Sequence, residues 1–112
     1  MGRVSRLTTE IWVAAYLTRL RLATIPAYIM QKGDGTAGAV LVKVNTLDGK
    51  ATCYQRSFDL MSGERQWVVL VEGEETLVDE SVTKQKSFDP DLWVIEIETR
   101  AAQHLLDEPG LE

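Results

Sequence analysis

Four acidic residues near the C-terminal end of the chain have the types and spacing that could do chemistry. Asp89 and Asp91 flank a proline in the stretch SFDPDLWVIEIETR, residues 87–100, and Glu96 and Glu98 follow two residues apart. Paired carboxylates can divide acid and base roles, and their oxygens suit hard divalent cations. Hydrolytic sites usually add a positioned histidine or a nucleophile, and neither is visible here. We favour turn-forming roles for the two aspartates, with a small metal-dependent hydrolase as the alternative.

A second group of residues could bind an anion. On a hairpin predicted over residues 40–56, Lys43, Tyr54 and Arg56 fall on one face, with Lys32 near them. Cations beside an aromatic ring on an open sheet can hold a phosphate, a carboxylate or a nucleotide base. A solvated sheet face with an ordinary Lys–Tyr cross-strand pair is the structural alternative, and we favour it.

Three other features are weaker candidates for chemistry. GDGTAG, residues 33–38, matches the G-x-G-x-x-G pattern of dinucleotide sites, but a strand pattern follows where that motif needs a helix, so we expect a hairpin loop. His104, the only histidine, has no ligand partners at zinc spacing. Cys53 is expected on the core face opposite Val44, as an inert buried thiol. The sequence therefore assigns no catalytic residue, cofactor or metal site.

The elements that must position these residues indicate a single α+β domain. We expect helices over residues 8–23, 73–88 and 99–108, and strands over residues 25–31, 39–47, 50–56, 66–72 and 89–98. This order predicts a mostly antiparallel sheet of about five strands, with an N-terminal helix, a helix before the last strand and a short C-terminal helix. The continuous apolar pattern of residues 66–72 predicts a central strand.

The first helix carries a broad apolar surface. One stripe at helical spacing consists of Val13, Tyr16, Leu17 and Leu20, and a second face adds Ile11, Ala14, Ala15 and Leu22. This breadth exceeds what one sheet face would cover. The helix is therefore either sandwiched in the domain or meets a partner chain through its second face.

The dipeptide Asp48-Gly49 predicts a two-residue hairpin turn. That turn sets Val44 opposite Cys53 and Lys43 opposite Tyr54. The predicted core face carries Val40, Val42, Val44, Ala51 and Cys53, and the predicted wet face carries Leu41, Lys43, Asn45, Thr52, Tyr54 and Arg56.

Composition limits the class of protein. The chain has 112 residues, 45% of them hydrophobic, a formal net charge of −5 and one cysteine. We expect one domain over residues 1–112, with an ordered core over about 6–107 and flexible termini. The negative charge argues against general binding to nucleic acid or anionic membranes. A lone cysteine suits a reducing cytoplasm, and no apolar run approaches the ~20 residues of a membrane span.

Three segments together resemble a known family. EIWVAAYLTR, KGDGTAGAVLVKVN and FDPDLWVIEIE, in this order and spacing, are similar to an uncharacterised family of small proteins found mainly in alphaproteobacteria and catalogued as a domain of unknown function, family 1491. The resemblance runs from about Arg6 to His104. It implies a bacterial protein of one domain, and it brings no activity, ligand or catalytic residue.

These observations favour a small cytoplasmic binding or protein-interaction module without enzymatic activity. The second face of the first helix is the expected contact of a homodimer. Two alternatives stay open, namely the hydrolase that uses the four acids and an anion or nucleotide sensor that uses the cationic hairpin face.

Overall fold

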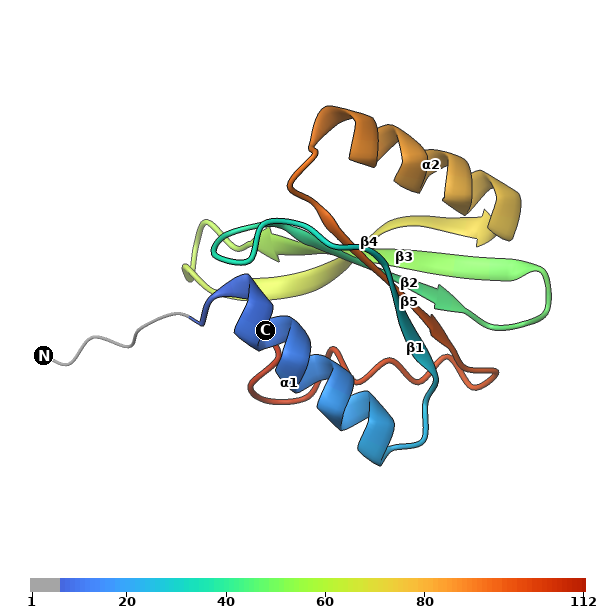
Figure 1. Ribbon diagram of the computed structural model, residues 1–112, viewed down its shortest axis with the longest axis horizontal. Coiled ribbons are helices and arrows are strands. Elements are labelled where there is room, and N and C mark those ends of the chain that lie inside the picture. The colour runs from blue at the N-terminus through green and yellow to red at the C-terminus, as the bar shows by residue number, and fades with distance from the viewer. Residues whose placement is uncertain (1–6) are drawn as a thin grey trace, which may run out of the picture.

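A five-stranded mixed sheet lies between two helices in the computed structural model of the chain, which describes residues 7–112 (Figure 1). The elements are α1 (Thr9–Leu22), β1 (Ala27–Gln31), β2 (Val40–Asn45), β3 (Lys50–Phe58), β4 (Arg65–Glu74), α2 (Glu75–Phe88) and β5 (Trp93–Glu98). The strand order is β1-β5-β2-β3-β4, and only the β2–β5 pair is parallel. The predicted α+β domain with a mostly antiparallel sheet is confirmed. The predicted flexible N-terminal end, before about residue 6, lies outside the described residues.

Helix α1 covers one face of the sheet. The Thr8 side chain caps it by accepting a hydrogen bond from the Ile11 backbone N–H, as a threonine before a helix favours. Trp12, Val13, Tyr16 and Leu20 are buried against β2 and β5, where they join the valines of β2 and alternate residues of β5 in the larger core. The predicted apolar stripe therefore faces the sheet.

Helix α2 covers the opposite face, over β3 and β4 (Figure 1). Val78 and Val82, four residues apart on one helical face, are its buried residues. They complete a second core, whose other buried members are Leu41, Ala51, Cys53, Leu92 and Val94. Because α1 and α2 cover both faces of β2, all six of its residues are buried.

The predicted register of the β2–β3 hairpin is wrong by one residue. Val44 pairs with Thr52 and Lys43 pairs with Cys53, because the loop has three residues, Leu47 to Gly49, instead of two. Since side chains alternate, this slip moves the β3 residues to the other face relative to β2. Cys53 was predicted on the same face as the β2 valines but lies on the opposite, α2 side. Tyr54 and Arg56 lie on the α1 side. The wet hairpin face does not exist as predicted.

Two predicted elements have a different place or form. The strand expected at residues 66–72 is β4, which lies at a sheet edge; its apolar residues pack against α2 and α1 in place of a second neighbouring strand. The helix expected at residues 99–108 is absent from the described C-terminal segment, where Ala102 and Leu105 have positive φ angles of 60° and 64°. A right-handed helix cannot include such residues.

The segment after β5 instead forms a strap across the α1 side of the domain. Leu105, Leu106 and Leu111 are buried in the larger core. The indole Nε1 atoms of Trp12 and Trp67 both donate to the Leu111 carbonyl oxygen, at 3.3 and 2.7 Å. These two bonds satisfy a backbone oxygen that is buried without secondary structure.

The glycine-rich segment at residues 33–38 is not a hairpin loop. It connects β1 to β2, and β5 lies between these two strands. Its carbonyl oxygens accept from the first turn of α1: Glu10 N–H donates to Gly35 at 2.8 Å and Thr9 N–H to Thr36 at 3.2 Å. A dinucleotide phosphate would need the free N–H groups of a helix that follows the glycines, whereas strand β2 follows them here. The segment therefore binds the N-terminal end of α1 and does not form a dinucleotide motif.

Candidate functional site

The four predicted cationic and aromatic site residues do not form one surface. Lys32 is exposed just after β1 at one edge of the sheet. Lys43 lies under α2, and Tyr54 and Arg56 lie on the α1 side. The predicted anion surface is therefore divided over three places.

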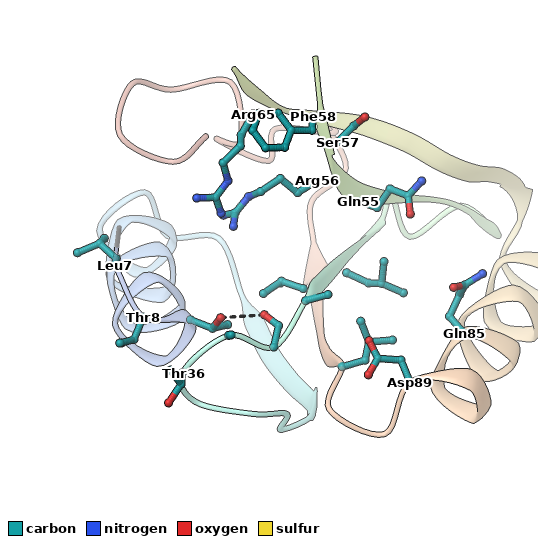
Figure 2. Close-up of a pocket in the computed structure, with 17 residues that line it drawn as sticks. Leu7, Thr8, Thr36, Gln55, Arg56, Ser57, Phe58, Arg65, Gln85 and Asp89 are labelled. Atoms are coloured by element: carbon teal, nitrogen blue, oxygen red, sulfur yellow. Dashed lines mark hydrogen bonds between the residues drawn. The ribbon is translucent and has the colours of Figure 1, made fainter. Parts of the chain in front are cut away.

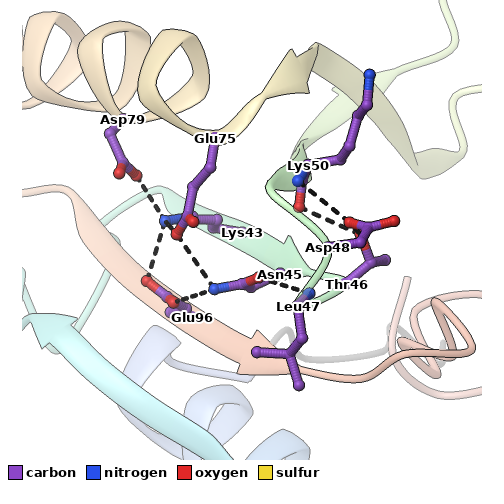
Figure 3. A network of polar contacts seen from close by, with 9 residues as sticks. All are labelled: Lys43, Asn45, Thr46, Leu47, Asp48, Lys50, Glu75, Asp79 and Glu96. Carbon is purple, nitrogen blue, oxygen red and sulfur yellow. Dashed lines mark hydrogen bonds and ion pairs between the residues drawn. The ribbon is translucent and has the colours of Figure 1, made fainter.

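Lys43 is enclosed in a network of acids between the sheet and α2 (Figure 3). Its side chain is 6% exposed, and its Nζ atom lies 2.6 Å from Asp79, 2.8 Å from Glu75 and 3.3 Å from Glu96. Asn45 joins the network by donating to Glu75 and Glu96. Burial alone would lower the pKa of Lys43, but hydrogen bonds to Asp79 and Glu75 and the charge of Glu96 outweigh it and raise the pKa. Lys43 is a structural cation.

Tyr54 and His104 form a second local cluster. Their ring centroids lie 4.7 Å apart, and the His104 Nδ1 atom accepts a hydrogen bond from the Leu106 backbone N–H at 2.9 Å. Burial lowers the pKa of His104, although the charge of Asp107 opposes the change. Burial also raises the pKa of Tyr54, with help from nearby carboxylates. This pair ties the C-terminal strap to β3.

The four predicted acids are also separated. Glu96 belongs to the Lys43 network, and Glu98 accepts a bond from the Tyr28 hydroxyl at 3.4 Å. Asp89 accepts a bond from the Asp91 backbone N–H at 3.0 Å, so the expected turn at this proline is confirmed. Among residues 7–112, no group of three or more His, Cys, Asp or Glu side chains could hold a metal ion.

Cys53 is fully buried, as its sequence context predicts, although on the α2 side of the sheet. Burial raises the pKa of its thiol to about 12, and the Lys43 charge reduces the effect. A thiol with this pKa is not a nucleophile at neutral pH.

A cleft of about 610 Å³ lies at one end of the sheet, between the N-terminal end of α1 and the C-terminal end of α2 (Figure 2). We call it the end cleft. Its walls come from six segments of the chain, and its lining consists of Leu7, Thr8, Thr9, Thr36, Ala37, Gly38, Ala39, Val40, Leu41, Gln55, Arg56, Ser57, Phe58, Arg65, Gln85, Asp89 and Leu92. The cleft exists because β3 and β4 extend past Val40, where β2 begins.

The charges in the end cleft are unevenly distributed. Arg56 and Arg65 extend over the side next to α1, whereas Gln85 and Asp89 lie on the side next to α2 (Figure 2). The Arg56 guanidinium carbon lies 4.9 Å from the Trp12 ring centroid and 4.8 Å from that of Trp67. Contacts of this length between a cation and an aromatic face are attractive and hold the guanidinium in place.

Sequence reasoning found only part of this cleft. Arg56 and Asp89 were both candidates, but in different predicted sites. Arg65 and Gln85 were missed as site residues, since one follows a turn and the other lies within a helix. Neither position carries a motif that marks a site.

Comparisons with known proteins agree with this architecture. A family model described as "Protein of unknown function (DUF1491)" matches residues 7–107. The chain belongs to the DUF1491 family. The resemblance predicted from three sequence segments is therefore confirmed. The match covers both helices, all five strands and every residue that lines the end cleft.

Solved DUF1491 structures share the fold. A crystal structure of a family protein from Caulobacter crescentus CB15 has a TM-score of 0.83 and 40% identity, covering 93% of this chain and 98% of that chain. An NMR structure from the same organism has a TM-score of 0.80 and 40% identity, covering 95% and 97%. The solution structure of Atu0922 from A. tumefaciens has a TM-score of 0.72 and 29% identity, covering 94% and 98%. A comparison with curated proteins finds no match.

Proposed function

We propose that this DUF1491 protein is a binding module without catalytic activity, and that the end cleft holds a negatively charged group of its ligand. The observation that carries the proposal is the charge of the cleft lining. Within the part of the chain that the structure describes, its charged residues are Arg56, Arg65 and Asp89, so the lining is cationic in a chain whose formal net charge is −5. The volume of about 610 Å³ lies within the range of roughly 300–1,000 Å³ that is typical of ligand sites.

The position of Arg56 supports binding further. Its guanidinium already contacts two indole rings, so little side-chain freedom remains to be lost when a ligand binds. A planar guanidinium also matches the geometry of a carboxylate or a phosphate. Arg65 approaches from the neighbouring strand, where its Cα pairs with that of Phe58. Two guanidinium groups on adjacent strands can hold one anionic group together.

The positions of side chains with shifted pKa values support a binding role over a catalytic one. Catalytic residues usually have shifted pKa values and lie in a cleft. Seven described groups with a shifted pKa lie outside the end cleft: Tyr16, Lys43, Asp48, Cys53, Tyr54, Asp59 and His104. Each shift has a structural cause, in burial, an ion pair or a turn. The metal-dependent hydrolase has less support, because its four acids are separated.

An NMR titration tests the anion site. We expect acetate, glutarate, phosphate and AMP to shift backbone amide signals of Thr36, Gly38 and Ser57, with a binding curve that saturates. Because charge pairing is screened by ions, affinity should fall as salt rises. Arg65→Gln should weaken binding, whereas Arg100→Gln, the same charge change at an exposed residue outside the cleft, should leave it unchanged. Absent or scattered shifts at millimolar ligand would refute the proposal.

A homodimer through α1 is a second candidate function. Its outer face leaves Ile11 and Leu22 54% and 79% exposed, and Leu7, just before the helix, is 56% exposed. Ala14 and Ala15 are exposed on the same helix. Light scattering at micromolar concentration should then give twice the chain mass, and Ile11→Arg should return it to the monomer. A monomeric mass for the unmodified chain would remove this candidate.

The buried, unpaired Cys53 supports a cytoplasmic location, where thiols stay reduced. No helix within residues 7–112 has the length and apolar character needed to cross a membrane.

A further inference from the structure

We infer that the end cleft takes a short peptide segment that carries both an acidic and a basic group, and that Asp89 holds the basic group. This inference rests on the proposed function, because the arginine side of the cleft must first bind the acidic group. It adds a role for the opposite side, next to α2.

The α2 side of the cleft attracts cations for two reasons. Among residues 7–112, Asp89 carries the only carboxylate that lines the cleft. It is also the C-cap residue of α2, and the C-terminal end of a helix carries a partial negative charge. The carboxylate and the helix end therefore favour an ammonium or guanidinium group at the same place.

The lining between the two charged sides suits a peptide backbone. Thr36, Gln55, Ser57 and Gln85 offer hydroxyl and amide groups that both donate and accept hydrogen bonds. Val40, Leu41 and Leu92 supply an apolar surface for an aliphatic side chain. A phosphate or a simple dicarboxylate would leave the Asp89 side unmatched, whereas a peptide with one acidic and one basic side chain complements both.

Four series of capped peptides test the assignment. Each peptide has two charged or neutral end positions separated by one, two or three residues of leucine and serine. The end positions are aspartate and lysine, aspartate and glutamine, asparagine and lysine, or asparagine and glutamine. Dissociation constants are measured from amide shifts of cleft residues at low salt.

We expect the best peptide with both charges to bind roughly two- to five-fold tighter than its acid-only counterpart, the gain of one partly exposed ion pair. Asp89→Asn should remove this difference without weakening the acid-only peptide, because the variant takes a negative charge out of the cleft. The asparagine Oδ1 atom can still accept the Asp91 N–H, so the turn is kept. Asp91→Asn is the matched control, because Asp91 is exposed and does not line the cleft, and it should preserve the difference.

The two proposals fail in different ways. Equal affinities for the acid-only and doubly charged peptides, or a difference that survives Asp89→Asn, would overturn the role of Asp89 and leave the anion site standing. If neither kind of peptide binds and the small anions do not bind either, both proposals are overturned.

Discussion

The Nζ atom of Lys43 in β2 lies 2.6 Å from the Asp79 carboxylate in α2, so one ion pair joins a central strand to the helix above it (Figure 3). Lys43 is 6% exposed, whereas Asp79 is 54% exposed, so the contact connects the interior to the surface. Glu75 and Glu96 complete the shell around the ammonium. Helix α2 is therefore held by charge as well as by Val78 and Val82.

Replacing Lys43 with methionine should destabilise the domain. The change keeps most of the length of the side chain but leaves the poorly exposed Glu96 carboxylate without its cation. We expect a loss of about 3 kcal/mol in the free energy of unfolding, at the low end for buried ion pairs, because Glu75 and Asp79 can still contact water. Chemical denaturation at neutral pH measures the loss.

Lys50→Met is the matched control. Lys50 also pairs with a glutamate, at 3.3 Å, but both side chains are about 60% exposed. Such a surface pair contributes at most about 1 kcal/mol. Equal losses for the two variants would contradict the structural role of the Lys43 network.

The register of the β2–β3 hairpin could not be predicted from the sequence, because it depends on side-chain hydrogen bonds within the loop. Asp48-Gly49 signals a two-residue turn, but Leu47 also adopts a positive φ of 62° and extends the loop. Asn45 Oδ1 accepts the Leu47 N–H at 2.8 Å, and Asp48 Oδ1 accepts from Thr46 and Lys50. These side-chain bonds offset the strain of a leucine in the left-handed region. No propensity rule anticipates the combination.

The sequence of a single strand is enough to show which of its residues share a face. Trp93, Ile95 and Ile97 face α1, whereas Val94 and Glu96 face α2, as a two-residue period requires. The cleft was not predicted, because it depends on how far β3 and β4 extend past β2. That length is a property of the assembled sheet, and the sequence pattern shows only which residues can form strands.

Trp93 should be one of the most costly residues to remove. It is 2% exposed, and its indole Nε1 donates to the Asp34 carbonyl oxygen at 2.8 Å. Trp93→Ala should lower the free energy of unfolding by about 3–5 kcal/mol, through the cavity that it leaves. Tyr28→Ala, at a residue 50% exposed on the edge strand, should cost far less. A melting temperature unchanged by Trp93→Ala would refute the burial of this side chain.

Two glycines of the β1–β2 connection should respond differently to alanine. A Cβ atom on Gly38 would lie 2.5 Å from the Asp91 carbonyl oxygen and 2.7 Å from that of Asp34, so the backbone must move. A Cβ on Gly35 would first meet the Glu10 side chain, at 3.6 Å. We expect Gly38→Ala to destabilise the domain by about 1–3 kcal/mol, as overpacking does.

Gly35→Ala is the control for this pair, and it should leave stability unchanged or raise it by up to about 1 kcal/mol, since it restricts the unfolded chain. Thermal unfolding of the two variants side by side gives the comparison. Equal tolerance of both alanines would mean that the segment does not pack against the turn before β5.

The stability of the domain should depend on the protonation of His104. Burial lowers the pKa of His104 from its ordinary value of 6.5, and its Nδ1 atom must be unprotonated to accept the Leu106 N–H. Below pH 6.5 the unfolded chain therefore binds a proton that the folded chain resists, so stability falls as the pH falls through the folded-state pKa. Asparagine at this position offers an oxygen that can accept the same N–H and does not titrate. His104→Asn should thus show a smaller loss of unfolding free energy between neutral and mildly acidic pH than the unmodified chain, whatever its stability at neutral pH, because the carboxylates titrate alike in both proteins. Denaturant unfolding at a series of pH values measures the two slopes, and identical slopes would show that His104 does not couple the C-terminal strap to pH.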